Sequence, residues 1–367
     1  MWRVTSGLTG LAKRSKVRVL TGKGAFIGPN EIEVRGSEGN ETIRFQTAEG
    51  LITAVDKVSF DIKPGEVLGL VGESGSGKSV TAKALMQLNG HNTRYDPESR
   101  ITLNLPDQAP VEVLDLKRPK DMMVIRGGAI SMIFQEPMAS FAPAITVGNQ
   151  MVEQLRLHSN MSKAQAKEIS VEMLARVGIS EPAKRFEQYA FEFSGGMRQR
   201  AMIAMALSTK PSLLVADEPT TALDVTIQAQ VIDLMKDLVS EFHMAILFIT
   251  HDLGVIAQTA DKVAVMYLGK IVETGPVREV IRSAAHPYTR GLLNALPKLD
   301  DVDAPLVPVP GDIPSPLERP KGCVFHTRCG DYIKGVCNQG VPGPVQLTPD
   351  HMARCFALDE NAKGATG

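Results

Sequence analysis

The sequence predicts an α/β protein with one nucleotide-binding domain, a helical insertion and a small cysteine-containing segment towards the C-terminus. A glycine-rich loop over residues 72–79 lies between a strand-like run and a helix-like run. A second apolar run, residues 213–216, ends in the acids Asp217 and Glu218. All four cysteines lie in the last fifth of the chain. The first two features are typical of α/β domains that bind phosphate groups, and the third indicates a separate terminal segment.

Composition limits the class of protein. The chain has 367 residues, of which 43% are hydrophobic and 22% are charged, as in ordinary globular proteins. The formal net charge is -1, so the protein has no overall positive charge that would attract nucleic acid. No apolar run approaches the roughly 18 residues of a membrane-spanning helix. The length fits one large domain or two modest ones, and any action at a membrane has to go through partner proteins.

Residues 1–30 form a basic N-terminal tail. They contain six lysines and arginines, and no acidic residue precedes Glu31. A secretory signal peptide needs a continuous apolar core, which this stretch lacks. A transit peptide or a membrane-surface helix is one alternative, and a basic tail without fixed structure is the interpretation that we favour.

The next part of the chain has strand-like patterns. Residues 31–60 alternate apolar and polar side chains, as β-strands do. Residues 63–66 (Lys-Pro-Gly-Glu) predict a tight turn before the strand that leads into the glycine-rich loop. Residues 89–120 are polar with scattered prolines, which indicates surface strands and loops. Residues 130–134 predict a buried strand that ends at Gln135.

A helical period replaces the strand pattern over residues 145–207. Ser162 is the predicted N-cap of one helix and Gly178 its end, and another helix begins near Gly195. We interpret this block as a helical insertion in the α/β domain. Further strands are predicted at residues 213–216, 245–250 and 263–267, with helices at 225–241 and 253–260.

The glycine-rich loop has the form GxxxxGK[ST] in the strand–loop–helix context that supports a phosphate-binding loop. Its glycines allow backbone N–H groups to converge on an anion, and the helix N-terminus adds partial positive charge. Lys78 is expected to reach the terminal phosphates, and the Ser79 hydroxyl to ligate Mg²⁺. A plain glycine-rich turn is the alternative. The predicted ATP-binding residues of this loop are Gly72, Glu73, Ser74, Gly75, Ser76, Gly77, Lys78, Ser79 and Val80.

The acids after the apolar run at 213–216 point to the chemistry of hydrolysis. Open α/β sheets bind ligands at the carboxyl ends of their strands, which is where Asp217 and Glu218 are expected. Asp217 suits a Mg²⁺ contact through water, and Glu218 is placed to accept a proton from an attacking water. A strand that simply ends in surface acids is the alternative.

Further motifs lie between and after these two. The run Ser194-Gly195-Gly196-Met197 precedes a helix and forms another anion-binding helix start. Taken with Gln135, Asp217 and Glu218, it resembles the motif order of ATP-binding-cassette (ABC) transporter ATPases. The D-loop of that family matches residues 221–224, ending at Asp224, and its switch histidine matches His251. The resemblance covers roughly residues 31–358.

The resemblance implies the fold and its division into domains. It implies a P-loop ABC ATPase core with an antiparallel β subdomain and an α-helical subdomain over about residues 138–210. The nucleotide-binding domain is expected at 31–283, after the tail at 1–30. A C-terminal extension with the cysteine cluster is expected at 284–367, beginning with a proline-rich connector.

The resemblance also implies roles for single residues. Two cassettes of this family sandwich two ATP molecules, so the signature Ser194 to Met197 is expected to contact the partner's ATP. Glu218 is expected to polarise the attacking water, His251 to contact the γ-phosphate, and Gln135 to contact Mg²⁺ and the water. Phe45 is the candidate for stacking on adenine, with an ordinary core role as the alternative.

Two details resemble one branch of the family more closely. The run at residues 193–200, with Met197 where most cassettes have glutamine, and the run at 286–293, His-Pro-Tyr-Thr-Arg-Gly-Leu-Leu, resemble the first ATPase subunit of oligopeptide and dipeptide importers. The run at 139–143 departs from that group's usual pattern, and so does the basic tail.

This branch implies the assembly and its location. The expected partners are a second homologous ATPase subunit, two transmembrane permeases and an extracytoplasmic solute-binding protein, without nucleic acid. The expected location is peripheral, at the cytoplasmic face of a bacterial inner membrane. Peptides are the expected substrate, with oligosaccharides, opines or nickel as alternatives. A soluble ABC ATPase that is not coupled to transport is a more remote alternative.

The cysteines Cys323, Cys329, Cys337 and Cys355 have the spacing C-x5-C-x7-C-x17-C. The short C-x2-C pairs typical of zinc ribbons are absent, and disulfides are unusual in cytosolic ATPases. The resemblance to this branch implies a [4Fe–4S] cluster held by the four thiols. Zinc and free thiols are the alternatives, and any bound metal is expected to have a structural role.

Overall fold

The structure is a computed structural model of the chain. It describes residues 32–34, 41–46, 51–105, 108–136, 140–220, 225–296 and 307–359. The basic tail and the predicted D-loop, including Asp224, lie outside the described residues.

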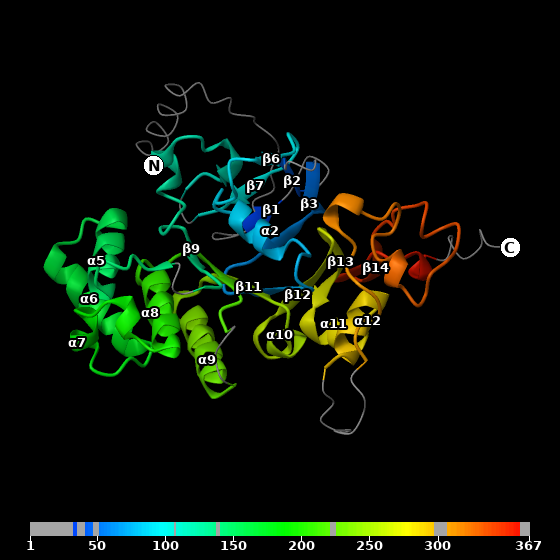
Figure 1. Cartoon of the computed structure of the whole chain (residues 1–367). Helices are drawn as coiled ribbons and strands as arrows, with labels where there is room; N and C mark the ends of the chain where they lie inside the picture. Colours follow the sequence, from blue (N-terminus) through cyan, green and yellow to red (C-terminus); the bar gives the residue numbers. More distant parts are fainter. Residues whose placement is uncertain are drawn as a thin grey trace.

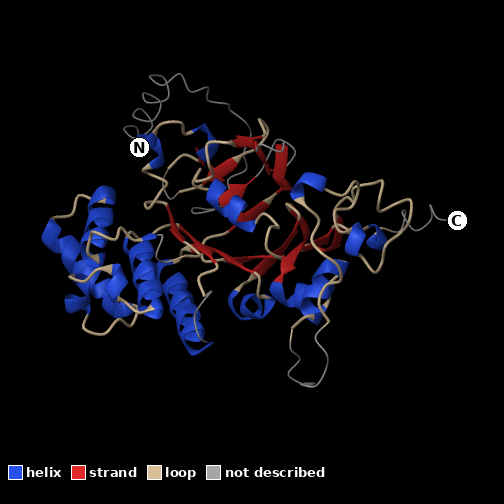
Figure 2. Cartoon of the chain, in the orientation of Figure 1, coloured by secondary structure: helices blue, strands red, loops and turns tan. Residues whose placement is uncertain are grey.

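One eight-stranded sheet runs through the molecule (Figures 1 and 2). Its strand order is β14-β15-β13-β12-β5-β11-β10-β9. The five strands from β12 to β9 are parallel, and β13, β15 and β14 extend the sheet in antiparallel fashion. The strands are β5 (Val67–Val71), β9 (Ile130–Ile133), β10 (Leu213–Asp217), β11 (Ala245–Thr250), β12 (Lys262–Tyr267), β13 (Lys270–Pro276), β14 (Val345–Thr348) and β15 (His351–Ala353).

Both faces of this sheet are buried, because two hydrophobic cores lie on its opposite sides. In β10, Leu214 and Ala216 belong to one core, and Leu213 and Val215 to the other. Successive side chains of a strand point to opposite faces, so a continuous apolar run is what a strand covered on both sides requires.

The antiparallel β subdomain covers one face together with α2 (Lys78–Ala84) (Figure 1). It has two further sheets, of order β4-β1-β7-β8 and β3-β2-β6. The short elements α3 (Pro119–Met122) and η1 (Val113–Asp115) follow them along the chain. The strands are β1 (Ile32–Val34), β2 (Glu41–Gln46), β3 (Leu51–Val58), β4 (Phe60–Ile62), β6 (Thr93–Tyr95), β7 (Ile101–Leu103) and β8 (Val111–Glu112).

Helices cover the opposite face, and the helical subdomain extends beyond the β9 edge of the sheet (Figure 2). The predicted caps are confirmed: the Ser162 side chain forms a capping box with Gln165, and Gly178 follows that helix with φ of 74°. The subdomain contains α5 (Val147–His158), α6 (Lys163–Arg176), α7 (Pro182–Phe186), η2 (Ala190–Glu192) and α8 (Gly195–Ser208). The remaining helices on this face are α9 (Val225–Phe242), α10 (Leu253–Thr259), α11 (Val277–Arg282) and α12 (Pro287–Asn294).

The C-terminal extension is not separate from the cassette, because its hairpin β14–β15 pairs with β13 at the edge of the main sheet. Phe325, from the cysteine segment, also belongs to the core that lies under the parallel strands. The rest of the extension has little regular structure, as the prolines predict. It contains only η3 (Pro316–Glu318), η4 (His326–Arg328) and η5 (Phe356–Leu358) outside the hairpin in the described part after residue 307.

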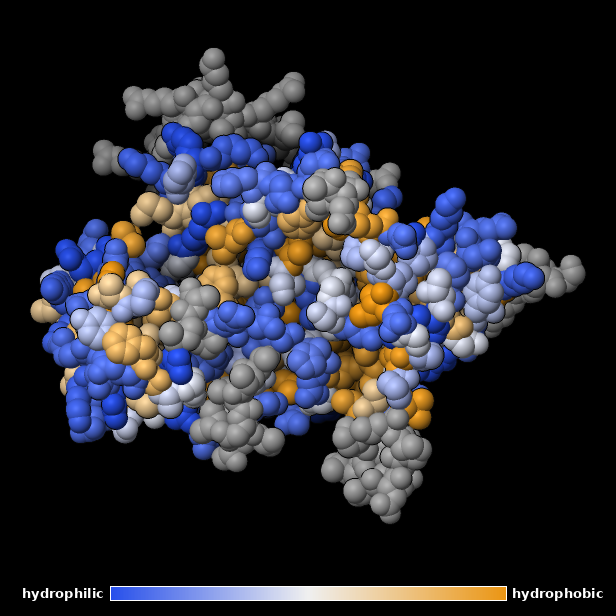
Figure 3. Space-filling model, in the orientation of Figure 1, coloured by the Kyte–Doolittle hydropathy of each residue, from blue (hydrophilic) through white to orange (hydrophobic). Residues whose placement is uncertain are grey.

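The surface is mostly hydrophilic on the face drawn in Figure 3, with hydrophobic residues in scattered groups. Among the residues that the structure describes, no helix combines the length and the apolarity needed to cross a bilayer.

Candidate functional site

Most of the predicted site residues meet at the carboxyl ends of three neighbouring parallel strands, and Gln135 follows the next strand of the sheet, β9. β5 leads into the glycine-rich loop, β10 ends at Asp217, and β11 ends just before His251. The strands are adjacent in the order β5, β11, β10, so motifs far apart in the sequence lie at one edge of the sheet. This is where open α/β sheets bind ligands.

The glycine-rich loop has a backbone that needs glycine at two positions. Gly77 has φ of 105°, and a Cβ there would lie 2.6 Å from the Ala54 carbonyl oxygen. A Cβ on Gly72 would lie 2.2 Å from the Met266 carbonyl oxygen. Both obstacles are backbone atoms, so a side chain at either position would force the loop away from its neighbours.

Lys78 is buried inside this loop. Its Nζ donates to the carbonyl oxygens of Gly72 at 2.7 Å and Glu73 at 3.1 Å. Burial lowers the pKa of Lys78, and the charges of Glu218 and Asp217 oppose that effect. The ammonium is therefore held at the place where a phosphate of a bound nucleotide is expected. The Ser76 hydroxyl, also buried in the loop, has no hydrogen-bond partner among the described residues.

A hydroxyl and a carboxylate are paired beside Lys78. The Ser79 hydroxyl donates to Oδ1 of Asp217 at 3.1 Å. Burial raises the pKa of Asp217, while the hydrogen bond from Ser79 acts in the opposite direction. Mg²⁺ takes oxygen ligands and is commonly held by one or two carboxylates together with substrate phosphates, so the donor set fits this ion.

Glu218 lies between two polar side chains that the sequence also selected. The Gln135 amide donates to its Oε2 at 3.1 Å, and Nδ1 of His251 lies 3.2 Å from its Oε1. The Glu218 backbone has φ of 48°, and its N–H donates to the carbonyl of Ile249 on the neighbouring strand. Asp252, which caps α10 with its carboxylate, fixes the chain directly after His251.

A cavity of about 210 Å³ lies beside Lys78, Ser79, Gln135 and Glu218, whereas Asp217 and His251 are not among the described residues that line it. Further lining comes from other residues of the phosphate loop and from β3. Pro316 and Arg319 of the proline-rich connector complete the wall. No sequence motif pointed to these two residues, because their position follows only from how the C-terminal extension folds back.

Arg319 is held in that wall by two contacts. Its guanidinium donates to the Leu268 carbonyl at 2.8 Å and forms an ion pair with Asp56 at 3.0 Å. The connector is thereby fastened beside the cavity rather than merely passing over it.

Phe45 is one of the predicted site residues that do not line the cavity. It lies on β2, opposite Ile52 of β3, and is half-buried against the core of the antiparallel subdomain. Ile52 lines the cavity, whereas Phe45 does not do so among the described residues. Stacking of Phe45 on adenine therefore stays a prediction.

The signature residues lie at the start of α8. The Ser194 side chain caps the helix by accepting from the Met197 N–H, and Ser194 and Gly195 are exposed. They are not among the described residues that line the cavity. Gln199 of the same helix donates to the Pro219 carbonyl, which ties α8 to the chain directly after Glu218.

The four cysteines lie in one module and are all free thiols. The Cys323 N–H donates to the Cys337 carbonyl at 2.8 Å, and burial raises the pKa of Cys323 and Cys329 to about 11. Within the described residues, no group of three or more His, Cys, Asp or Glu is arranged to hold a metal ion. The expected [4Fe–4S] cluster is therefore not supported by the geometry of the structure.

Comparisons with known proteins agree with this architecture. Residues 55–221 match the family described as ABC transporter, and residues 272–337 match the family described as oligopeptide/dipeptide transporter, C-terminal region. A dimeric bacterial ABC transporter cassette of known structure superposes with a TM-score of 0.58 at 25% identity, covering 67% of this chain and 99% of that one.

Sequence relatives are closer. The chain is 48% identical over 318 residues to the oligopeptide transport ATP-binding protein OppD of Salmonella typhimurium, covering 86% of this chain and 91% of that protein. It is 44% identical over 326 residues to the dipeptide transport ATP-binding protein DppD of Bacillus subtilis, covering 89% and 95%. The predicted fold, with its P-loop core, two subdomains and C-terminal extension, is confirmed. The chain belongs to the ABC transporter family, in its oligopeptide and dipeptide branch.

Proposed function

We propose that this chain is the ATP-hydrolysing subunit that powers an ABC importer of peptides. The observation that carries the proposal is the position of Glu218, between Gln135 and His251 at the cavity formed by the phosphate loop. The C-terminal region of the oligopeptide/dipeptide type supports the choice of peptide as substrate. Oligosaccharides, opines and nickel are the alternative cargoes that the experiment below distinguishes.

ATP binds along the phosphate loop in this proposal. Lys78 exchanges its two loop carbonyls for phosphate oxygens, and Ser79 and Asp217 hold Mg²⁺ through oxygen atoms. The metal, when bound, neutralises negative charge on the phosphates. Gln135 faces the same space and is the third candidate for contact with the ion.

Glu218 is the residue that accepts the proton of the attacking water. Its carboxylate accepts a hydrogen bond from Gln135 and lies within hydrogen-bond distance of His251 on the other side, and Glu218 lines the cavity. His251 is assigned to the γ-phosphate by its motif. Its side chain is 63% exposed, and its Nδ1 lies 3.2 Å from Oε1 of Glu218. Positioning and electrostatic stabilisation of this kind account for most catalysis of phosphoryl transfer.

The site is completed by a second, homologous ATPase subunit. Support comes from the signature residues Ser194 and Gly195, which are exposed and do not line the cavity of their own chain. A second subunit that places its own signature over this cavity gives the sandwich arrangement. Asp224 is assigned to the contact between the two cassettes by its motif alone.

Two permease subunits dock on the side of the helical subdomain. A cavity of about 320 Å³ lies between the helical subdomain and the chain after α2, and its lining includes Met86, Leu88, Phe134, Met202 and Met205. A short permease helix with apolar side chains is the occupant that this lining fits. The chain then lies peripherally at the cytoplasmic face of the inner membrane, and a binding protein delivers the peptide from outside.

A [4Fe–4S] cluster held by the four cysteines is a further part of the proposal. It is supported by four unpaired cysteines in one module, although their arrangement in the structure does not form a metal-binding group. Anaerobic purification of the full chain tests it: a brown protein with about four irons per chain supports the cluster. Stoichiometric zinc, or a colourless protein without iron, contradicts it.

The test of the whole function uses the complex that the cell assembles. The tagged chain is purified from native membranes in mild detergent, and the accompanying proteins are identified by mass spectrometry. Two permeases and a second cassette protein, with ATPase activity stimulated by peptide-loaded binding protein, support the proposal. If a sugar, an opine or nickel stimulates the ATPase instead, that compound is the cargo rather than a peptide. If the chain is active without membrane partners, the importer function is contradicted.

A further inference from the structure

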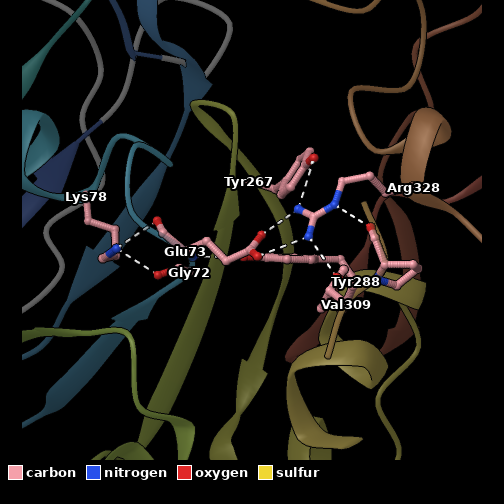
Figure 4. A network of polar contacts seen from close by, with 8 residues as sticks. Gly72, Glu73, Lys78, Tyr267, Tyr288, Val309 and Arg328 are labelled. Carbon is pink, nitrogen blue, oxygen red and sulfur yellow. Dashed lines mark hydrogen bonds and ion pairs between the residues drawn. The ribbon is translucent and has the colours of Figure 1, made fainter. Parts of the chain in front are cut away.

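The C-terminal extension reaches the phosphate loop through Arg328 and Tyr288 (Figure 4). Arg328 forms a two-pronged ion pair with Glu73, the second residue of the loop, with distances of 2.7 Å and 3.1 Å. The two residues are 255 positions apart in the sequence. Only 4% of the Arg328 side chain is exposed, so water screens this pair weakly.

The remaining donors of Arg328 are also used. Its Nε donates to the Pro310 carbonyl at 2.8 Å and a terminal nitrogen donates to the Val309 carbonyl at 3.2 Å. The guanidinium also lies over the Tyr267 ring, 5.8 Å from its centre. A planar guanidinium that is bonded on several sides has one fixed orientation, and lysine cannot reproduce that geometry.

Glu73 is held by its backbone as well as by its carboxylate. Its N–H donates to the Tyr288 hydroxyl at 2.9 Å, and its carbonyl accepts from Lys78 at 3.1 Å. The N–H of Ser76 donates to the same carbonyl at 3.2 Å. The residue next to the phosphate site is therefore fixed from one side by the loop itself and from the other by the C-terminal extension.

An aromatic cluster keeps the two anchoring side chains in place. Tyr288 of α12 is completely buried and packs against Tyr267 of β12, with ring centres 4.7 Å apart. Phe325, three residues before Arg328, packs against both tyrosines. Packing of this kind restricts rotamers, so the arginine and the tyrosine hydroxyl are presented to the loop in a defined position.

Charge gives the ion pair a consequence for ligand binding. A carboxylate in the loop repels a nucleoside triphosphate, because both are negative and the surroundings are partly buried. Arg328 neutralises that carboxylate and turns it away from the phosphate side. The loop that remains presents Lys78 and its backbone N–H groups to the ligand.

We propose that Arg328 and Tyr288 are positioning residues of the ATP site, through which the C-terminal extension sets the affinity of the phosphate loop for ATP. They do not touch ATP themselves; they act by fixing and neutralising Glu73. The inference rests on the proposed binding of ATP at this loop, and adds that the cassette depends on its extension for that binding.

Isothermal titration of the full chain with Mg²⁺ and a non-hydrolysable ATP analogue tests the inference. Arg328→Met is expected to weaken binding about tenfold or more, as loss of a charged hydrogen-bonded pair does. Adding Glu73→Gln to this variant removes the uncompensated carboxylate and is expected to restore affinity to within about threefold of the parent. If Arg328 served only to fold the extension, the second substitution would restore nothing, and that result overturns the inference.

A matched control breaks an ion pair of the same extension that does not reach the loop. Arg290 and Asp331 form such a pair, with nearly half of each side chain exposed. Arg290→Met is expected to leave affinity within about twofold of the parent, because an exposed pair contributes little. An equal loss of affinity in this control would show a general effect of disturbing the extension, and would overturn the inference.

A second variant covers the case in which Arg328→Met does not fold. Tyr288→Phe keeps the ring in the aromatic cluster and removes only the acceptor for the Glu73 N–H. It is expected to weaken binding about fivefold, the effect of leaving one donor unpaired. Unchanged affinity in a folded Tyr288→Phe protein overturns the inference. If the parent itself binds no analogue, and Lys78→Ala changes nothing, the proposed function fails instead.

Discussion

The carboxylate of Glu273 lies 2.8 Å from Nε2 of His351, and both side chains are almost completely buried. Glu273 belongs to β13 of the cassette and His351 to β15 of the C-terminal hairpin. The same carboxylate accepts the N–H groups of Ala285 and His286, which lead into α12. One buried acid therefore joins the sheet, the hairpin and the helix that supports the phosphate loop.

Removal of His351 is expected to destabilise the protein. His351→Ala takes away one partner of a buried carboxylate and leaves a space, which costs about 2 kcal/mol of unfolding free energy. Chemical denaturation measures it. Thr348→Val, in the same hairpin, is the control. It removes an exposed hydrogen bond to Glu279 of α11 and is expected to change the free energy of unfolding by less than about 0.5 kcal/mol. Equal effects of the two variants would contradict the buried pair as an anchor.

Glu218→Gln is expected to bind Mg·ATP with affinity close to that of the parent and to lose turnover. The amide keeps the size of the side chain and can still bond to Gln135, but it cannot accept a proton from water. General-base catalysis contributes about 10²–10⁴-fold, so kcat in the assembled complex should fall by that factor.

Glu241→Gln serves as the control, because Glu241 forms a surface ion pair with Arg176 away from the cavity. A Glu218→Gln complex that hydrolyses ATP at more than about a tenth of the parent rate would exclude the general-base role.

Lys78→Ala is expected to weaken ATP binding itself. The ammonium is buried in the loop proposed to hold the phosphates, and its two present bonds go to carbonyls of that loop. We expect Kd for Mg·ATP to rise about tenfold or more, as for loss of a charged hydrogen bond. Lys63→Ala, in the exposed turn before β5, is the matched control. Binding by Lys78→Ala at the parent affinity would contradict the placement of the phosphates.

Stability is expected to decrease as the pH falls from about 7 towards 4. Burial, with a smaller contribution from the charge of Arg290, lowers the pKa of His286 to about 3. His286 therefore takes up a proton near pH 6.5 in the unfolded chain, but only near pH 3 in the folded chain. Between these values the unfolded state binds more protons, and acidification favours it by at most about 1.4 kcal/mol per pH unit for this group.

His286→Asn isolates that contribution. Asparagine can still cap α12 at the Tyr288 N–H, which the imidazole now does, but it does not titrate. The difference in unfolding free energy between parent and variant should shift in favour of the variant as the pH falls below 6.5. A difference that stays constant from pH 7 to pH 4 would contradict the neutral, buried state of His286.

Local sequence patterns predicted most elements of the cassette. The strand at residues 67–71, the turn at 63–66 and the helices after Ser162 and Ser194 are where they were expected. Each depends on a contiguous signal: an apolar run, a Pro-Gly pair or an N-cap. The helix-like run after the phosphate loop extends from Ser79 to Leu88 in the sequence, but the helix ends at Ala84, because the backbone turns sharply at Gln87, where φ is 49°.

The candidate site was predictable for the same reason. Gln135, Asp217, Glu218 and His251 each follow a buried strand, and parallel strands bring their carboxyl ends to one edge. The strand order decided which of them meet, and it placed Glu218 between Gln135 and His251. Phe45 had no such strand end to fix its direction, and the structure packs it against the core.

By itself, the sequence determined the family and predicted the roles of the loop, the acids and the switch histidine, because each motif is a short run whose residue types define its local geometry. Only the tertiary structure decided that Arg319 lines the cavity beside the phosphate loop and that Arg328 forms an ion pair with Glu73. Contacts across 255 residues depend on where the β14–β15 hairpin joins the sheet and on how the aromatic cluster packs. Side chains that meet through long-range packing carry no local pattern, and so the contact between the phosphate loop and the C-terminal extension could be seen only in the folded chain.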